Sequence, residues 1–336
     1  MSTTIEMLYA SYVVGGLGAG CVYGAAMGMA NKWFPDRRGL AVGLTAAGYG
    51  AGATLTVAPI QAIIENSGYQ QAFIVFGIIQ GVVCLVAAQF TALPPKGWLP
   101  SGFDPEAYAR KKAVRQTLRQ INPAGMVKTS HFWLLYLMFV LSAPGGLFIT
   151  SAIGPIAQFY GLDKTHLALG ATVLILSVQV TRALNGLARA FWGWISDHIG
   201  RENTMAIAFT IEGVSMLLWL WTIRDPWMFV IMSGVVFVGW GCVFALFSAS
   251  TGDLFGTKYA TTNYGIVYTA KGVASIIGAP VAAVMFEVTH SWDLVFYVFA
   301  ASALITAALA LFVLKPLTAK YVRYVEPPKP GTVLGS

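Results

Sequence analysis

Two basic residues interrupt stretches of this sequence that are otherwise apolar enough to cross a membrane. Arg189 lies in the run 167–196, and Lys271 lies in the run 264–288. A cation inside a bilayer costs about 2.5–3.5 kcal/mol on the most lenient scale, so it is retained where it faces a cavity, a counter-ion or a ligand. An arginine presents a planar fork to one carboxylate, and a lysine presents a compact charge to another. The pair predicts a pocket for a small dianion.

The depths of these residues agree. Arg189 is eight residues before Asp197, and Lys271 is eight residues after Asn263. At 1.5 Å per helical residue, both cations lie about 12 Å from the end of their helix. Four aromatic residues lie at a similar depth of about 12–20 Å, within a hydrocarbon core about 30 Å thick. They are Tyr23, Tyr49, Trp240 and Phe244.

Helical spacing places the cations on polar stripes. One stripe holds Arg182, Asn185, Arg189 and Ser196, and another holds Tyr264, Tyr268, Lys271 and Ser275. Residues three, four and seven positions apart share one face of a helix. Packing is the commoner role for any one aromatic residue, but the shared depth of the set favours the lining of a bundle interior.

The composition places these helices in a membrane. Hydrophobic residues make up 57% of the 336-residue chain and charged residues only 10%, against roughly 25% charge in soluble domains. Nine runs have the length and apolarity of a membrane span. They are 7–30, 40–64, 71–93, 132–160, 167–196, 204–223, 226–251, 264–288 and 294–314. The fold class predicted is an all-α polytopic membrane bundle of about nine transmembrane helices.

The net charge of +7 follows the membrane topology rather than a nucleic-acid surface. Most Lys and Arg residues fall in the long linker, the C-terminal tail and alternate loops, whereas the opposite loops hold only Lys164 and Arg224. The positive-inside rule therefore predicts a multi-pass protein of the inner (plasma) membrane whose linker and C-terminus are cytoplasmic. Nucleic acid is not an expected partner.

The polar linker divides the chain into unequal blocks. We expect a partial N-terminal half at 1–93, a cytoplasmic linker at 94–130, a six-helix C-terminal half at 131–315 and a cytoplasmic tail at 316–336. Cys21-Val22-Tyr23 precedes Cys242-Val243-Phe244 by 221 residues, which is the offset that a six-plus-six repeat predicts. Three helices before the first run would then be absent.

Several motifs resemble the oxalate/formate antiporters of the major facilitator superfamily. They are Tyr23-Gly24-Ala25-Ala26-Met27, the segment Asn31 to Gly39, Ala46-Ala47-Gly48-Tyr49-Gly50, Asn185 with Arg189-Ala190-Phe191-Trp192-Gly193, Ser196-Asp197 with Gly200-Arg201, and Asn263-Tyr264-Gly265 with Ala270-Lys271. The resemblance implies a twelve-helix fold, of which this chain holds the equivalents of helices 4–12.

The resemblance also implies a substrate site. Arg189 and Lys271 would bind carboxylates, inside a cage to which Tyr23, Tyr49 and Trp240 contribute. Phe244 stands where the family pattern has a tyrosine. The charged segments at Asp36-Arg37-Arg38 and at Asp197 with Arg201 are similar to the gating clamps of the superfamily, although solvated loops explain their charges about as well.

Two further charged residues lie within spans. Arg182 and Glu212 are expected to form an ion pair between neighbouring helices; alternatively, Glu212 carries a coupled proton.

The sequence gives no sign of an enzyme. It contains no GxxxxGK[ST] phosphate loop. The four histidines show neither zinc-ligand spacing nor a catalytic triad. Cys21, Cys84 and Cys242 are isolated within spans and are expected to be packing residues. No catalytic residue, metal or cofactor is expected.

Together with this resemblance, the observations favour a secondary transporter that exchanges a small dicarboxylate (oxalate-like) for a monocarboxylate (formate-like) by alternating access. One alternative is a proton-coupled monocarboxylate carrier in which Glu212 titrates. Another is a non-transporting truncated membrane protein with a structural role. The expected partners are small carboxylate anions, the lipid bilayer and either a missing N-terminal segment or a partner chain.

Overall fold

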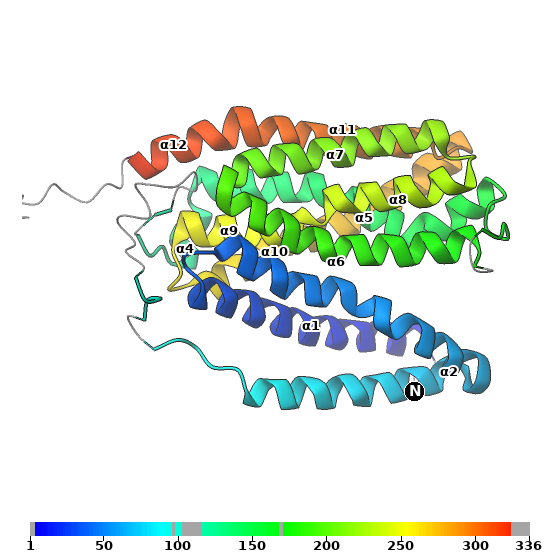
Figure 1. Ribbon diagram of the computed structural model, residues 1–336, viewed down its shortest axis with the longest axis horizontal. Coiled ribbons are helices and arrows are strands. Elements are labelled where there is room, and N and C mark those ends of the chain that lie inside the picture. Colours follow the sequence, from blue (N-terminus) through cyan, green and yellow to red (C-terminus); the bar gives the residue numbers. More distant parts are fainter. Residues whose placement is uncertain (1–3, 96–97, 103–115, 118, 168–170, 324–336) are drawn as a thin grey trace, which may run out of the picture.

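The computed structural model describes residues 4–95, 98–102, 116–117, 119–167 and 171–323 of the chain. It is a bundle of long helices running roughly parallel to one axis (Figure 1). The helices are α1 (Ile5–Trp33), α2 (Arg38–Gln89), α4 (Pro123–Val127), α5 (Ser130–Phe159), α6 (Val173–Ile199), α7 (Arg201–Thr222), α8 (Pro226–Trp240), α9 (Cys242–Phe255), α10 (Ala260–Thr289), α11 (Asp293–Leu309), the π-helix η1 (Ala310–Leu314) and α12 (Lys315–Arg323). Within these described ranges, β-structure is limited to one isolated bridge between His166 and Thr172.

The predicted all-α class is confirmed, with corrections to individual spans. Seven helical segments of the described chain are long and apolar enough to cross a membrane. They do not include α6, which carries Arg182 and Arg189, or the first part of α2. The fifth expected run begins as a helix only at Val173, and the last one continues to Arg323, eight residues into the segment expected to be tail.

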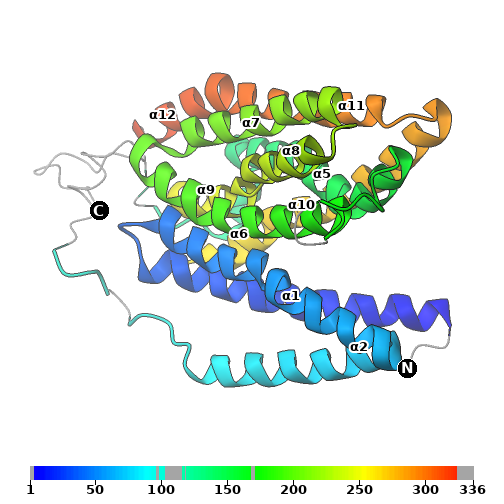
Figure 2. The same ribbon diagram turned by 45° about the vertical axis from the view of Figure 1, so that its right-hand side comes forward.

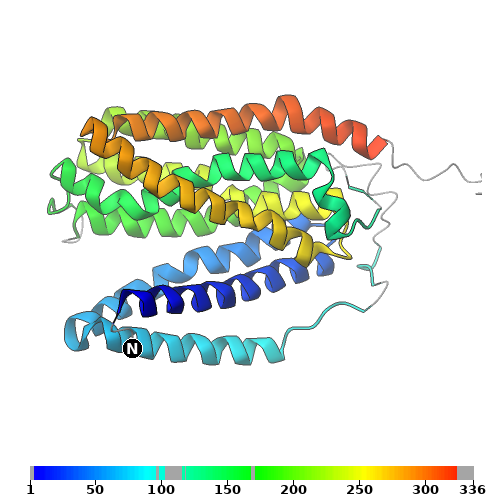
Figure 3. The ribbon, with the colours of Figure 1, turned by 180° about the vertical axis from the view of Figure 1, so that it is seen from behind.

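Two glycines shape the helices in ways that the hydrophobic pattern does not reveal. The second and third expected runs merge into α2, which reverses at Gly68, where φ is +82°. A residue with a Cβ rarely adopts this backbone conformation. Figures 1 and 3 show the two arms of α2 running in opposite directions. Gly241 interrupts the seventh run and separates α8 from α9.

Side-chain caps fix where several helices begin. The side chains of Thr129, Thr172 and Asp225 accept hydrogen bonds from the backbone N–H groups of Phe132, Ile175 and Met228. Each cap satisfies a donor that has no partner within its own helix. These caps set the register of α5, α6 and α8, which carry or support the candidate site.

The first arm of α2 packs along α6, and α1 packs against α10. Small residues allow the α2–α6 approach: a Cβ built on Gly43 would lie 2.4 Å from the carbonyl oxygen of Arg189, and one on Gly193 would lie 2.1 Å from that of Gly39. Such close backbone contacts are typical of membrane helices. We call this contact the α2–α6 seam.

The seam is closed at one end of the bundle. We call this end the linker end, because the described parts of the linker and α12 lie there together with the turns at 34–37, 200 and 256–259. Away from the linker end, α1 and α2 diverge from the other helices (Figures 1 and 2). The second arm of α2 is the most peripheral segment, and most of its side chains are exposed.

Candidate functional site

Arg189 lies in the middle of α6, with only 4% of its surface exposed. Its Nε and Nη2 atoms each donate to Asn185 Oδ1 at 3.3 Å, and its Nη1 donates to the backbone oxygen of Ala46 on α2 at 2.9 Å. Asn185 lies one turn earlier on the same helix. These three bonds fix the plane of the guanidinium.

Lys271 reaches the same region from α10. It is half-buried, and its Nζ lies 3.3 Å from the hydroxyl of Tyr268. The Nζ also lies 5.4 Å from the ring centroid of Phe244, and the Cζ of Arg189 lies 4.4 Å from the same centroid. The two cations are therefore no farther apart than the sum of these distances. Both contacts are within the range of a cation–π interaction.

Neither cation is neutralised by an acidic residue that the structure describes. Among the residues that the structure describes, no ion pair involves Arg189 or Lys271. Like charges repel more strongly in a buried site than in water, because the effective dielectric constant is lower. An anion placed between the two cations would relieve this repulsion.

An aromatic cluster connects the remaining predicted residues. Tyr23 is 4% exposed, and its ring centroid lies 5.0 Å from those of Tyr49 and Tyr268. Trp240 is also buried, and its ring meets Phe244 edge-on at 5.1 Å. Tyr49 is the outlier, with 55% of its surface exposed. All six residues predicted for the site thus belong to one connected cluster.

Trp240 is held in place by α5. Its Nε1 donates to the backbone oxygen of Ala143 at 3.1 Å. A Cβ built on Gly146 would lie 2.2 Å from the indole, so this position on α5 leaves room for the ring. Ala143 and Gly146 belong to the α5 segment Ala143-Pro144-Gly145-Gly146, whose small side chains let Trp240 approach the helix backbone.

The structure adds two residues to the predicted set. Tyr268 contacts Tyr23, Phe244 and Lys271, and Asn185 orients Arg189. Their signal in the sequence was their place on the polar stripes. The carbonyl of Ala46 has no such signal, because a backbone group leaves no trace in residue type.

The expected ion pair between Arg182 and Glu212 does not form. Both oxygens of the Glu212 carboxylate are buried, and within the described residues they have no hydrogen-bond partner. The predicted ion pair requires α6 and α7 to pack side by side at the depth of these two residues. Instead, α8 packs extensively against both of them, whereas α6 and α7 meet much less.

A second polar cluster closes the linker end. Asp253 on α9 accepts hydrogen bonds from Arg38 Nη1 and Arg201 Nε, each at 2.8 Å. Arg201 also pairs with Asp197 at 2.7 Å and donates to Ser196. All four charged side chains of this charge cluster are less than a tenth exposed.

The charge cluster also caps α2. The two carboxylate oxygens of Asp197 accept from the backbone N–H groups of Gly39 and Leu40 at 3.0 and 2.9 Å. Negative charge at a helix N-terminus is stabilising. Of the residues expected at the clamp, Arg38, Asp197 and Arg201 come together, whereas Arg37 stays 70% exposed beside Asp36.

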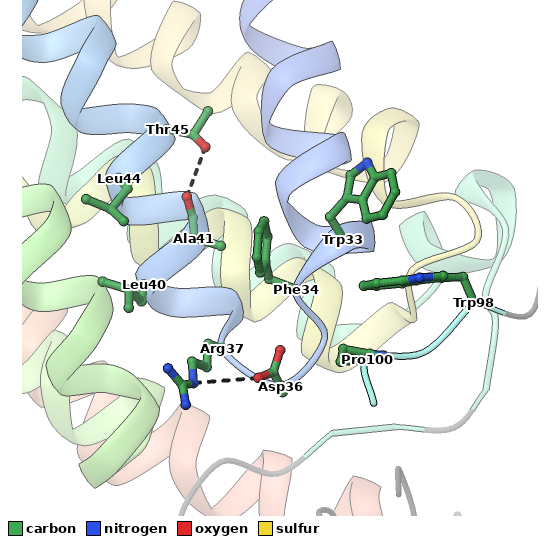
Figure 4. A pocket seen from close by; sticks show the side chains of 10 residues that line it. All are labelled: Trp33, Phe34, Asp36, Arg37, Leu40, Ala41, Leu44, Thr45, Trp98 and Pro100. Carbon is green, nitrogen blue, oxygen red and sulfur yellow. Dashed lines mark hydrogen bonds and ion pairs between the residues drawn. The ribbon is translucent and has the colours of Figure 1, made fainter. Parts of the chain in front are cut away.

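A pocket of about 480 Å³ opens near this end, away from the two cations (Figure 4). Its walls are Trp33, Phe34, Asp36, Arg37, Leu40, Ala41, Leu44, Thr45, Trp98 and Pro100. Trp33 Nε1 donates to the oxygen of Ala92 at 2.7 Å, and its ring lies 4.8 Å from that of Trp98. These contacts attach the linker to the α1–α2 turn.

A helical membrane bundle that encloses a cation pair among aromatic side chains has the design of a solute carrier. Its sequence matches the model of the Major Facilitator Superfamily over residues 1–187 and 181–334. The chain belongs to this superfamily, a family of transporters of small solutes rather than of enzymes.

Several known proteins are similar to this chain in sequence. The chain is 35% identical to the oxalate:formate antiporter of Oxalobacter formigenes, over 94% of this chain and 71% of that protein. It is 27% identical to an uncharacterized 38 kDa protein of Thermoproteus tenax, over 96% and 73%. It is 22% identical to monocarboxylate transporter 12 of Rattus norvegicus, over 88% and 64%. The resemblance predicted from the motifs is confirmed.

Proposed function

We propose that this carrier exchanges a small dicarboxylate, such as oxalate, for a monocarboxylate, such as formate, by alternating access. The observation that carries the proposal is that two cations, neither paired with a described acid, lie against one aromatic ring. A dianion relieves their repulsion with one carboxylate on the fork of Arg189 and the other on Lys271. A monoanion is held by one cation, as exchange requires.

The aromatic residues favour a small substrate. Phe244 contacts both cations, and Trp240 and Tyr268 pack around it. Aromatic walls limit the width of a site and exclude water, which strengthens the attraction between the cations and the anion. The 35% identity with a protein named as an oxalate:formate antiporter supports the same substrate class.

The positions of the two clusters support alternating access. From the charge distribution we assign the linker end to the cytoplasm and the protein to the plasma membrane. The charge cluster then closes the cytoplasmic side in this conformation. We assign residues 1–93 and 131–315 to two moving halves that rock about the site.

Uptake into proteoliposomes tests the proposal. Labelled oxalate should enter vesicles preloaded with formate much faster than vesicles loaded with buffer, at equal pH on both sides. Uptake that does not depend on the internal anion would contradict exchange. Absence of any carboxylate uptake by correctly inserted protein would favour the structural role.

One observation favours a second candidate, a proton-coupled monocarboxylate carrier. Glu212 is fully buried without a described partner, and burying a charged carboxylate in this way is costly. Formate uptake into unloaded vesicles, measured with and without an inward proton gradient, distinguishes the two functions. Stimulation that Glu212→Gln abolishes would favour coupling, whereas exchange that Glu212→Gln leaves intact would favour the antiporter.

A further inference from the structure

One bond of the candidate site crosses between the two blocks of the chain. Arg189 Nη1, on α6, donates to the backbone oxygen of Ala46, on α2. The bonds from the same guanidinium to Asn185 stay within α6. If α2 and α6 separate, the Asn185 bonds move with the arginine, but the Ala46 bond must break.

This bond lies on the α2–α6 seam. Toward the linker end, the backbones of Gly39 and Gly193 are in close contact, and the charge cluster lies beyond them. At the depth of the site, the bond from the guanidinium to Ala46 lies between two further close contacts of these helices, Gly43 with the oxygen of Arg189 and Gly186 with Ala51. The inner part of the seam thus includes a side-chain hydrogen bond from the residue proposed to bind substrate, beside its small-residue contacts.

The local sequence of α2 makes room for this bond. A Cβ built on Gly50 would lie 3.0 Å from both Cζ and Nε of Arg189, so even an alanine there requires the guanidinium to shift by a few tenths of an ångström. By contrast, a Cβ on Gly48 or Gly52 would meet nothing within 4 Å. Of these three glycines, Gly50 is the one packed against the arginine.

We infer that Arg189 is also a latch, which holds the α2–α6 seam closed while the site is empty and which a bound carboxylate releases. This inference rests on the proposed function. A carboxylate is a stronger acceptor for a guanidinium than a neutral carbonyl, because the bond is charge-assisted on both sides. Substrate thus competes with Ala46 for Arg189.

The latch gives a physical reason for obligatory exchange. A ligand shifts a conformational equilibrium only through its different affinity for the two states. The empty carrier keeps the Arg189–Ala46 bond and rarely opens its seam. The loaded carrier has lost this bond and opens the seam more often. Because a hydrogen bond to a charged group is at stake, the expected difference is roughly tenfold or more in the open population.

Gly50→Ala tests the latch, with Gly52→Ala as the matched control on the same helix. For each variant, oxalate uptake into unloaded vesicles is divided by uptake into formate-loaded vesicles. We expect this ratio to rise about tenfold in Gly50→Ala, because the empty carrier now opens, and to stay at the wild-type value in Gly52→Ala. An unchanged ratio in Gly50→Ala, with exchange retained, would overturn the latch.

A second measurement needs no change at Gly50. Val42 directly precedes Gly43, a seam residue of α2, and is fully buried. Val42→Cys, in a protein with its three native cysteines replaced by alanine, therefore reports opening. Oxalate should speed labelling by a maleimide added from the linker end about tenfold. No acceleration, in protein that still exchanges, would overturn the latch. If the wild-type protein does not exchange oxalate for formate at all, the proposed function, and not only the latch, is rejected.

Discussion

The guanidinium of Arg38 lies 2.8 Å from the carboxylate of Asp253, and this buried ion pair joins the start of α2 to α9. Arg201 shares the same carboxylate. The pair thus links two segments that are 215 residues apart in sequence, at the end of the bundle where the α2–α6 seam is closed.

Loss of Arg38 should weaken this closure. Arg38→Ala leaves Asp253 buried with one cation instead of two, and removing one partner of a buried ion pair typically costs about 3–5 kcal/mol. We expect a clear drop in the thermal unfolding temperature of the purified protein. The control is Arg37→Ala, which removes an exposed arginine and should cost about 0–1 kcal/mol. Equal stability of the two variants would show that the Arg38 pair does not hold this end together.

Substitution of Arg189 should abolish dicarboxylate binding. Arg189→Ala removes the fork, and Arg189→Lys cannot hold Asn185 and Ala46 while it binds a carboxylate through two N–H groups. We expect both variants to bind oxalate at least about tenfold more weakly, as loss of a hydrogen bond to a charged group predicts. Equilibrium binding of labelled oxalate to purified protein measures this. Wild-type affinity in Arg189→Ala would remove the basis of the proposed site.

Lys271→Ala should discriminate between substrates. The proposed dianion uses both cations, whereas the monoanion uses one, so the variant should lose oxalate affinity much more than formate affinity. Competition of unlabelled oxalate and formate for the same site gives the two affinities. Equal losses for both anions would indicate that Lys271 does not carry the second carboxylate.

Much of the site was predictable because helix geometry is regular. A rise of 1.5 Å per residue and a repeat of 3.6 residues place side chains at a known depth and face. Arg189, Lys271, Tyr23 and Phe244 meet because each lies at the same depth on an inward stripe. The hydrophobic runs predicted the approximate positions of most helices, because a bilayer demands a certain length of apolar sequence, but not their merging in α2 or their division at Gly241.

The remaining features depend on which helices are neighbours. Arg182 and Glu212 stay apart because α8 lies against both of their helices, and the pattern of the sequence does not encode that order. Asp253 gains its two arginines from α2 and from the start of α7. The reversal at Gly68 depends on a positive φ angle at that residue. Most other described glycines lack a positive φ, so residue type alone does not predict where the chain reverses.

The contact between α5 and Trp240 yields a last prediction. A methyl group on Gly146 would meet the indole at 2.2 Å, so Gly146→Ala should displace Trp240 from Phe244 and from the oxygen of Ala143. Overpacking of this kind typically costs about 1–3 kcal/mol. We expect slower oxalate exchange and a lower unfolding temperature. Gly154→Ala, on the same helix, is the control, because a Cβ there meets nothing within 4 Å. If both variants exchange oxalate at the wild-type rate, the position of Trp240 does not matter for transport, and the aromatic wall is only packing.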